Sequence, residues 1–195
     1  MKIVWKGFLN EHNLFIYSDL PVDAKKLISD KRTWVTYLLI IPVLIMAYTG
    51  IRLRLPYVTG FMFVKWAVLI GVALSLPFLV IHELIHAIFC PKASEIFLYV
   101  TSAGICLIPT CPLSKYRYII MAMMPTIILG ISPFLVWLLH PGLNVQTGSV
   151  LFGFSIGNLS MCIGDIYNAI LAAAKMTSES VLVTSGKDCY YFKKS

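Results

Sequence analysis

Charged residues are scarce in this chain. Asp, Glu, Lys and Arg together make up 13% of its 195 residues, whereas soluble domains carry about 25%. Apolar residues make up 58%, compared with roughly 45–50% in soluble domains. This composition excludes a disordered chain, a coiled coil and an ordinary soluble enzyme, because so many apolar side chains require contact with lipid.

Several diagnostic motifs are also missing. The five cysteines include no Cys-x-x-Cys pair and their number is odd, so reduced thiols are expected rather than a disulfide framework. The segment Gly153-Phe-Ser155-Ile-Gly157 has Gly-x-Ser-x-Gly spacing, but its apolar run contains no histidine, so the serine-protease combination is missing. The first thirty residues contain no apolar core of a secretory signal, so a cleaved signal peptide is not expected.

Long apolar runs are abundant, by contrast. Four of them are present, at about 33–50, 61–90, 118–139 and 149–174. A bilayer is crossed by about 20 consecutive apolar residues in a helix. The runs therefore predict an α-helical polytopic membrane protein with about four transmembrane helices.

The positive charge is unevenly distributed. The formal net charge is +7. If both termini are cytoplasmic, most of the Lys and Arg residues lie on the cytoplasmic side of the membrane. The exceptions include Arg52 and Arg54, in the first loop. The positive-inside rule then predicts an integral membrane protein with both termini cytoplasmic. Lipid, rather than nucleic acid, is the expected partner of this charge.

Short β-prone stretches lie between and beside the apolar runs. Residues 95–109 predict a hairpin at the membrane surface. Lys2–Leu9 and Asn13–Tyr17 predict a second hairpin, and the cytoplasmic tail 175–195 contains a third, at 180–194. The edge of the 95–109 hairpin could accept an extended peptide as an added strand.

An HExxH motif, His82-Glu83-Leu84-Ile85-His86, lies near the end of the second apolar run. On a helix, His82 and His86 are one turn apart on the same face, where two neutral imidazoles can bind one Zn²⁺. Glu83 borders that face and can take a proton from metal-bound water. The alternative is a pair of helix histidines that only hydrogen-bond to their neighbours.

A catalytic zinc needs three protein ligands and one open position. Of the nine acidic residues, only Glu83 and Asp165 lie within predicted spans, so Asp165 is the expected third ligand and sits near the cytoplasmic side. It could instead be a polar residue that bonds to a neighbouring helix. Glu95 is an alternative ligand that Pro91 and a surface position disfavour. Asn158, two turns before Asp165, could hydrogen-bond a substrate backbone or another helix.

These motifs resemble those of the site-2 protease class of intramembrane zinc metalloproteases. The more similar branch is the small bacterial family called "putative zincin peptidase", by length, by the HELIH motif and by Gly164-Asp165 on the last run. The resemblance covers about 34–175. Site-2 proteases usually carry Asn-x-x-Pro and Leu-Asp-Gly, where this chain has Asn158-Leu-Ser-Met and Gly-Asp-Ile. It also has no PDZ-like insertion.

The resemblance implies that His82, His86 and Asp165 bind Zn²⁺ and that Glu83 is the general base. Residues 1–195 would then form a single membrane-embedded metalloprotease domain in a bacterial plasma membrane. The implied activity is zinc-dependent endoproteolysis of membrane-embedded or membrane-tethered peptide substrates.

Two other functions stay open. A non-catalytic zinc-binding membrane scaffold or regulator would keep the metal, although a structural zinc needs no base beside its ligands. A small ion transporter subunit could use Asp165 and the histidines, but no inverted repeat is visible.

Overall fold

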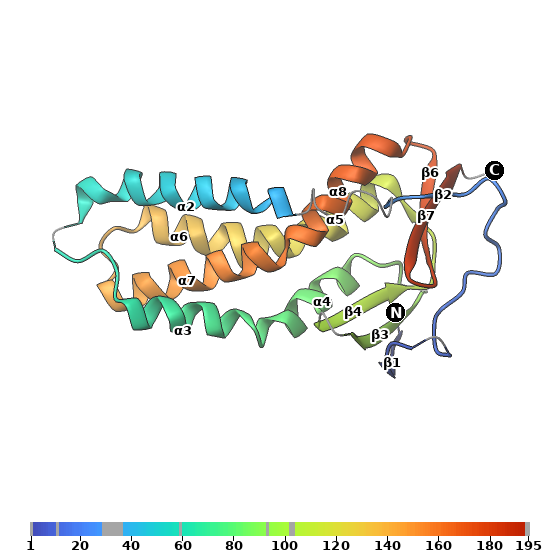
Figure 1. Cartoon of the computed structure of the whole chain (residues 1–195), viewed down its shortest axis with the longest axis horizontal. Helices are drawn as coiled ribbons and strands as arrows, with labels where there is room; N and C mark the ends of the chain where they lie inside the picture. Colours follow the sequence, from blue (N-terminus) through green and yellow to red (C-terminus); the bar gives the residue numbers. More distant parts are fainter. Residues whose placement is uncertain are drawn as a thin grey trace. The chain divides into compact units, whose positions relative to one another are not determined.

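The computed structural model describes residues 2–10, 12–28, 37–58, 60–92, 94–101 and 104–193. The chain forms two compact units, each made of segments that are distant in sequence. We call Met1–Thr33, Leu79–Met124 and Asp165–Ser195 the mixed unit, and Trp34–Phe78 and Pro125–Gly164 the helical unit. Most of their helices and strands are labelled in Figure 1.

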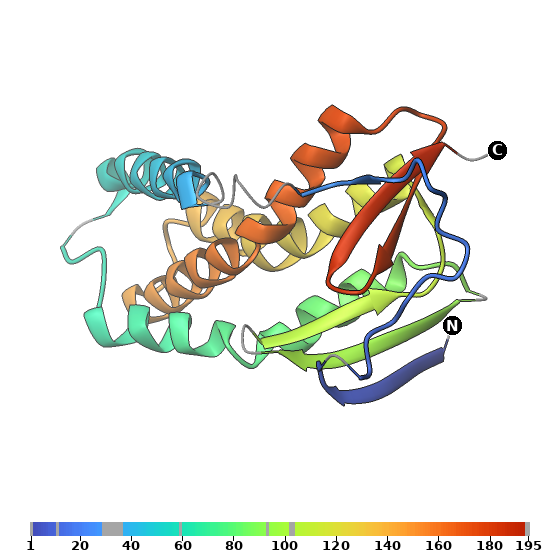
Figure 2. The same cartoon turned by 45° about the vertical axis from the view of Figure 1, so that its right-hand side comes forward.

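The first sheet of the mixed unit contains the predicted 95–109 hairpin. Its strand order is β1-β3-β4, with bounds Lys2–Phe8, Glu95–Thr101 and Gly104–Pro109. Strands β3 and β4 are antiparallel, whereas β1 joins β3 in parallel. Strand β4 is therefore an edge of this sheet, as Figure 2 shows from a second side.

The predicted hairpin between Lys2–Leu9 and Asn13–Tyr17 is wrong. The Asn13 side-chain amide donates to the carbonyls of Lys6, at 3.1 Å, and Phe8, at 2.7 Å. These bonds occupy the edge of β1 that a returning strand would need. A β-prone sequence specifies a strand but not its partner, and here the partner is β3, 93 positions along the chain at the Lys2–Glu95 pair.

The second sheet joins the chain's N-terminal and C-terminal parts. Its strand order is β2-β7-β6-β5, with bounds Lys25–Lys26, Asp188–Lys193, Ser180–Ser185 and Leu113–Ser114. Strands β6 and β7 form the hairpin expected in the tail, and Gly186 in its turn has a φ of 64°, which glycine adopts without strain.

The core of the mixed unit lies between these sheets and three helices. The helices are α4 (Phe78–Ile88), α5 (Lys115–Pro125) and α8 (Ile163–Lys175). Ala87, Met121 and Ala172, one from each helix, pack in a buried cluster with Ile96 and Leu182 from the two sheets. This core fixes α4 and α8, which carry the predicted metal ligands.

The helical unit packs through small residues. Its helices are α2 (Ile40–Arg54), η2 (Leu55–Tyr57), α3 (Lys65–Ser75), the π-helical segment η3 (Thr126–Ile131), α6 (Ser132–Leu139) and α7 (Val145–Met161). A Cβ on Gly71 would clash with the carbonyl oxygen of Val150, and one on Gly153 with that of Val68. Helices α3 and α7 therefore touch backbone to backbone.

The prediction of a four-helix polytopic membrane protein is wrong. Within the described residues, one continuous helix, Lys115–Leu139, is long and apolar enough to cross a membrane. Two helix pairs are bent at a short break, and if each pair counts as one span, the number of possible spans rises to three. The chain also forms two β-sheets, which a four-helix architecture does not contain.

The physical reason is that hydropathy does not show where a helix ends. The 61–90 run breaks after Leu76, because Pro77 has no N–H to continue the helix, and the 149–174 run breaks at Cys162. The 33–50 run begins at residues 33–36, which lie outside the described residues, and α2 has only 15 residues.

Candidate metal centre

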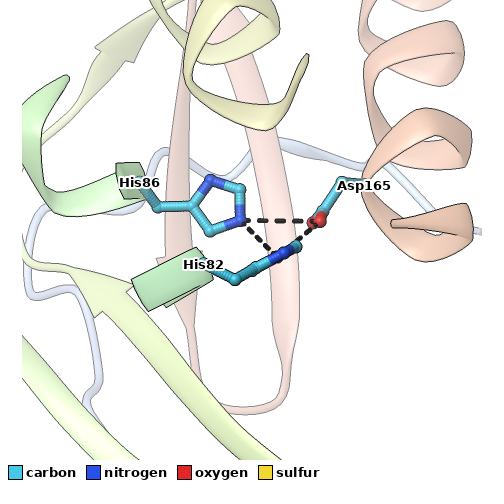
Figure 3. A group of neighbouring side chains, drawn as sticks. All are labelled: His82, His86 and Asp165. Carbon is cyan, nitrogen blue, oxygen red and sulfur yellow. Dashed lines mark hydrogen bonds and ion pairs between the residues drawn. The ribbon is translucent and has the colours of Figure 1, made fainter. Parts of the chain in front are cut away.

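Two helices bring three metal-ligating side chains together. His82 and His86 lie one turn apart on α4, and Asp165 lies in the first turn of α8. The Asp165 Oδ2 is 2.9 Å from the Nε2 of His82 and 3.5 Å from that of His86, and the two Nε2 atoms are 3.1 Å apart. Figure 3 shows the three side chains converging.

This arrangement fits a tetrahedral zinc ion. Zinc bonds of 2.0–2.1 Å place neighbouring ligand atoms about 3.3 Å apart, and the three separations here lie on either side of that value. Two imidazoles and a carboxylate form a donor set typical of catalytic zinc, with a fourth position left for water or substrate. Among the described residues, these three side chains form the one such group.

The imidazole of His86 is oriented by a main-chain carbonyl. Its Nδ1 lies 2.8 Å from the carbonyl oxygen of Met121, on α5. Since a carbonyl can only accept, Nδ1 carries the hydrogen, and the lone pair of Nε2 points toward Asp165. A metal-binding histidine is commonly held in the correct tautomer in this way.

The Glu83 carboxylate lies beside this cluster. One of its oxygens is 4.0 Å from the His82 Nε2, and the backbone N–H of Leu107, in β4, donates toward it. Only 9% of Glu83 is exposed. The carboxylate thus lies next to the three ligand atoms and against the edge strand.

A cavity of about 280 Å³ opens beside the cluster. Glu83, His86 and Asp165 line it, together with most of β4 and with apolar side chains of α5 and β6. Three cysteines, Cys106, Cys111 and Cys189, also reach its lining. Burial, with a smaller contribution from the nearby charge of Glu83, raises the pKa of Cys106 to about 12, so this thiol is neutral near pH 7.

Two other predicted residues have different environments. Glu95, the alternative ligand, is exposed and forms an ion pair with Lys2 at 3.1 Å. Asn158 belongs to the helical unit, where its Nδ2 donates to the carbonyl of Phe154 at 2.9 Å within α7. Its role in substrate binding stays a prediction.

Sequence reasoning missed the contributions of Met121 and Leu107. Both act through main-chain atoms, which are shared by all residues except for the missing N–H of proline, so no side-chain pattern could have indicated them. The hairpin prediction at 95–109 was the one signal that placed a strand edge in the neighbourhood of Glu83.

Comparison with known proteins agrees with this geometry. No curated protein and no solved structure matches the chain. The sequence model of a family described as "Putative zincin peptidase" matches residues 75–180, which make up more than half of the chain. The matched segment contains both histidines, Glu83 and Asp165, and the chain belongs to this family.

Proposed function

We propose that this protein is a zinc-dependent intramembrane endopeptidase, with Glu83 as its general base. Family membership indicates the coarser activity, a zinc-dependent metallopeptidase. The observation that carries the proposal is the Glu83 carboxylate next to the His82, His86 and Asp165 donor atoms, in a cavity with apolar walls.

His82, His86 and Asp165 would hold the zinc. When bound, zinc polarises a carbonyl and lowers the pKa of its water to about 7. Glu83 then accepts a proton from the attacking water and delivers it to the leaving amide nitrogen, so that the peptide C–N bond is replaced by a carboxyl group and an amine. The hydrogen bond from His86 to Met121 keeps Nε2 available throughout.

The free edge of β4 is suited to binding a peptide as the substrate. An extended peptide can pair with a free strand edge through main-chain hydrogen bonds, and its side chains then alternate between the two faces. Strand β4 is at the edge of its sheet and lines the cavity from Ile105 to Pro109. A peptide paired with this edge would run alongside Glu83.

Membrane association is supported by the apolar surface of two segments. The Lys115–Leu139 helix is long enough to cross a bilayer. On α2, the side chains of Ile41, Leu44, Ile45 and Tyr48 are between 48% and 64% exposed, and lipid would cover such apolar groups. We place both termini and the metal centre toward the cytoplasm, as the distribution of Lys and Arg predicts.

Zinc content tests the metal centre. We expect about one zinc per chain in detergent-purified wild type, because three protein ligands suffice for a catalytic site. Zinc should be lost in His82→Ala and Asp165→Ala and kept in Glu83→Gln. A well-folded wild type without zinc would contradict the proposal.

Cleavage of a library of quenched fluorescent apolar peptides tests the general base. Glu83→Gln should reduce the cleavage rate by about 10²–10⁴-fold, with zinc content unchanged. Wild-type cleavage by this variant would overturn the role of Glu83. Zinc binding without cleavage by the wild type would favour the scaffold function instead.

A further inference from the structure

Asn168 lies on the same face of α8 as Asp165. The spacing of three residues places the two side chains one above the other on a helix. Asn168 lines the cavity that also contains Glu83, His86 and Asp165, whereas its chain neighbours Tyr167 and Ala169 are buried, with 8% and 4% exposed. The Asn168 side chain therefore faces the space in which a substrate of this centre would lie.

The Asn168 amide has no hydrogen-bond partner among the residues that the structure describes. Other polar side chains in long helices bond to their own helix. Asn158 donates to the carbonyl of Phe154, and the Ser160 hydroxyl donates to that of Ile156, each at 2.9 Å. Asparagine is also a poor residue for a helix interior. Asn168 thus does not stabilise its helix and forms no hydrogen bond within the described chain. Its amide is available at the cavity wall.

A carboxamide is chemically matched to a peptide group. Its NH₂ donates and its oxygen accepts, so it can pair with both the C=O and the N–H of one peptide unit. Two other polar side chains on the cavity lining are less suited. The Lys187 ammonium can only donate, and the Thr184 hydroxyl already lies 3.8 Å from the Cys189 thiol.

We propose that Asn168 binds the main chain of the peptide substrate beside the metal ligands. This inference rests on the proposed peptidase function. With β4 lining the same cavity, the substrate would be held by the strand edge and by the Asn168 amide, and its scissile peptide would be oriented toward the centre formed by the histidines and Asp165. Asn168 is then a substrate-binding residue that the side-chain pattern around the metal motif does not reveal.

Two zinc-directed inhibitors distinguish substrate binding from support of the metal site. Acetohydroxamic acid carries the zinc-binding group alone, and an N-acylated dileucine hydroxamate carries the same group on a peptide. We would measure the binding of both to the zinc-loaded full chain, in wild type, Asn168→Ala and Ile170→Ala. Ile170 is on the same helix, half exposed and away from the cavity lining, so its truncation is the matched control.

We expect Asn168→Ala to weaken the dileucine hydroxamate about tenfold, the effect of one or two lost hydrogen bonds. Acetohydroxamate binding and zinc content should change less than about twofold, as should every value for Ile170→Ala. If Asn168→Ala unfolds, Asn168→Asp, which has the same shape but no amide donor, replaces it and should also weaken the dileucine hydroxamate selectively.

Other outcomes overturn the inference in distinguishable ways. Equal binding of the dileucine hydroxamate by wild type and the Asn168 variants refutes it and leaves the proposed peptidase intact. Equal weakening of both inhibitors, or loss of zinc, assigns Asn168 to the metal site instead. If zinc-loaded wild type binds neither inhibitor, the proposed function fails, and the inference fails with it.

Discussion

The two units of this chain use their buried polar groups differently. In the helical unit, the hydroxyls of Ser75, Ser149 and Ser155 each donate to a main-chain carbonyl of that unit at 2.6 Å. In the mixed unit, His82 and His86 are also buried, but they converge with Asp165 beside a cavity. Burial of a polar side chain therefore does not by itself indicate function. Convergence of ionisable groups on an open space does.

The two units also differ in what holds them together. The mixed unit relies on strand pairing and on an apolar core formed by α4, α5 and α8. The helical unit relies on the close approach of α3 and α7 at glycines. Changes at the metal centre of the first unit should affect activity more than folding, and changes at the glycine contacts of the second should do the reverse.

The largest expected effect is that of removing the metal. Treatment with a zinc chelator should reduce peptide cleavage by a factor of at least about 10³, and added Zn²⁺ should restore it. The helical circular dichroism signal should persist, since none of the three ligands lies in the helical unit. Mg²⁺ is the control, because it prefers oxygen ligands and should not restore activity. Cleavage that survives chelation would contradict the metal's role.

Next in size is the effect of filling the contact between α3 and α7. Gly153→Ala should destabilise the chain by about 3 kcal/mol, because its Cβ would meet the main chain of Val68, which no rotamer change can relieve. Gly164→Ala is the matched control. No described atom lies within 4 Å of its Cβ, so this change should be neutral or stabilise helix α8 by up to about 1 kcal/mol. Thermal unfolding of the purified chain measures both, and equal effects would refute the close contact.

Substitution of Arg54 tests whether a buried charge stabilises the helical unit. Only 4% of Arg54 is exposed, and its guanidinium donates to the carbonyls of Trp137, His140 and Pro141 at the end of α6. A cation there also interacts favourably with the helix dipole. We expect Arg54→Met to cost about 2 kcal/mol of stability, with zinc content unchanged.

Arg52 provides the comparison for that variant. It lies two residues earlier in α2 and is exposed, so Arg52→Met should change stability by less than about 0.5 kcal/mol. If thermal unfolding shows equal losses for the two variants, the carbonyl contacts of Arg54 do not stabilise α6.

The smallest expected effect concerns the turn beside the cavity. Gly186 has a φ of 64°, so Gly186→Ala should destabilise the β6–β7 hairpin by about 1 kcal/mol. Gly142 is outside the left-handed region, and no described atom lies within 4 Å of its Cβ. Gly142→Ala should therefore leave the melting temperature nearly unchanged. A larger loss for Gly142→Ala than for Gly186→Ala would reverse this ranking.

The sequence predicted the three side chains that the structure brings together, His82, His86 and Asp165, whereas the predicted architecture was wrong. The HExxH spacing placed His82 and His86 on one helical face, and Asp165 followed because so few acidic residues lie in apolar runs. The prediction of the spans was wrong because apolar content does not show where a helix ends, as the breaks at Pro77 and Cys162 demonstrate. The predicted partner of β1 was wrong because packing, and not local preference, decides how strands pair over long separations in the sequence.

The amino-acid sequence by itself determined the donor set and its chemistry, since the identity of a side chain fixes whether it can bind zinc or accept a proton. Only the tertiary structure decided which carbonyl orients His86, which strand edge lies against Glu83 and which asparagine faces the cavity. The physical reason is that main-chain donors and acceptors are the same at every residue except proline, which has no N–H. Their use depends on which segments the fold brings together.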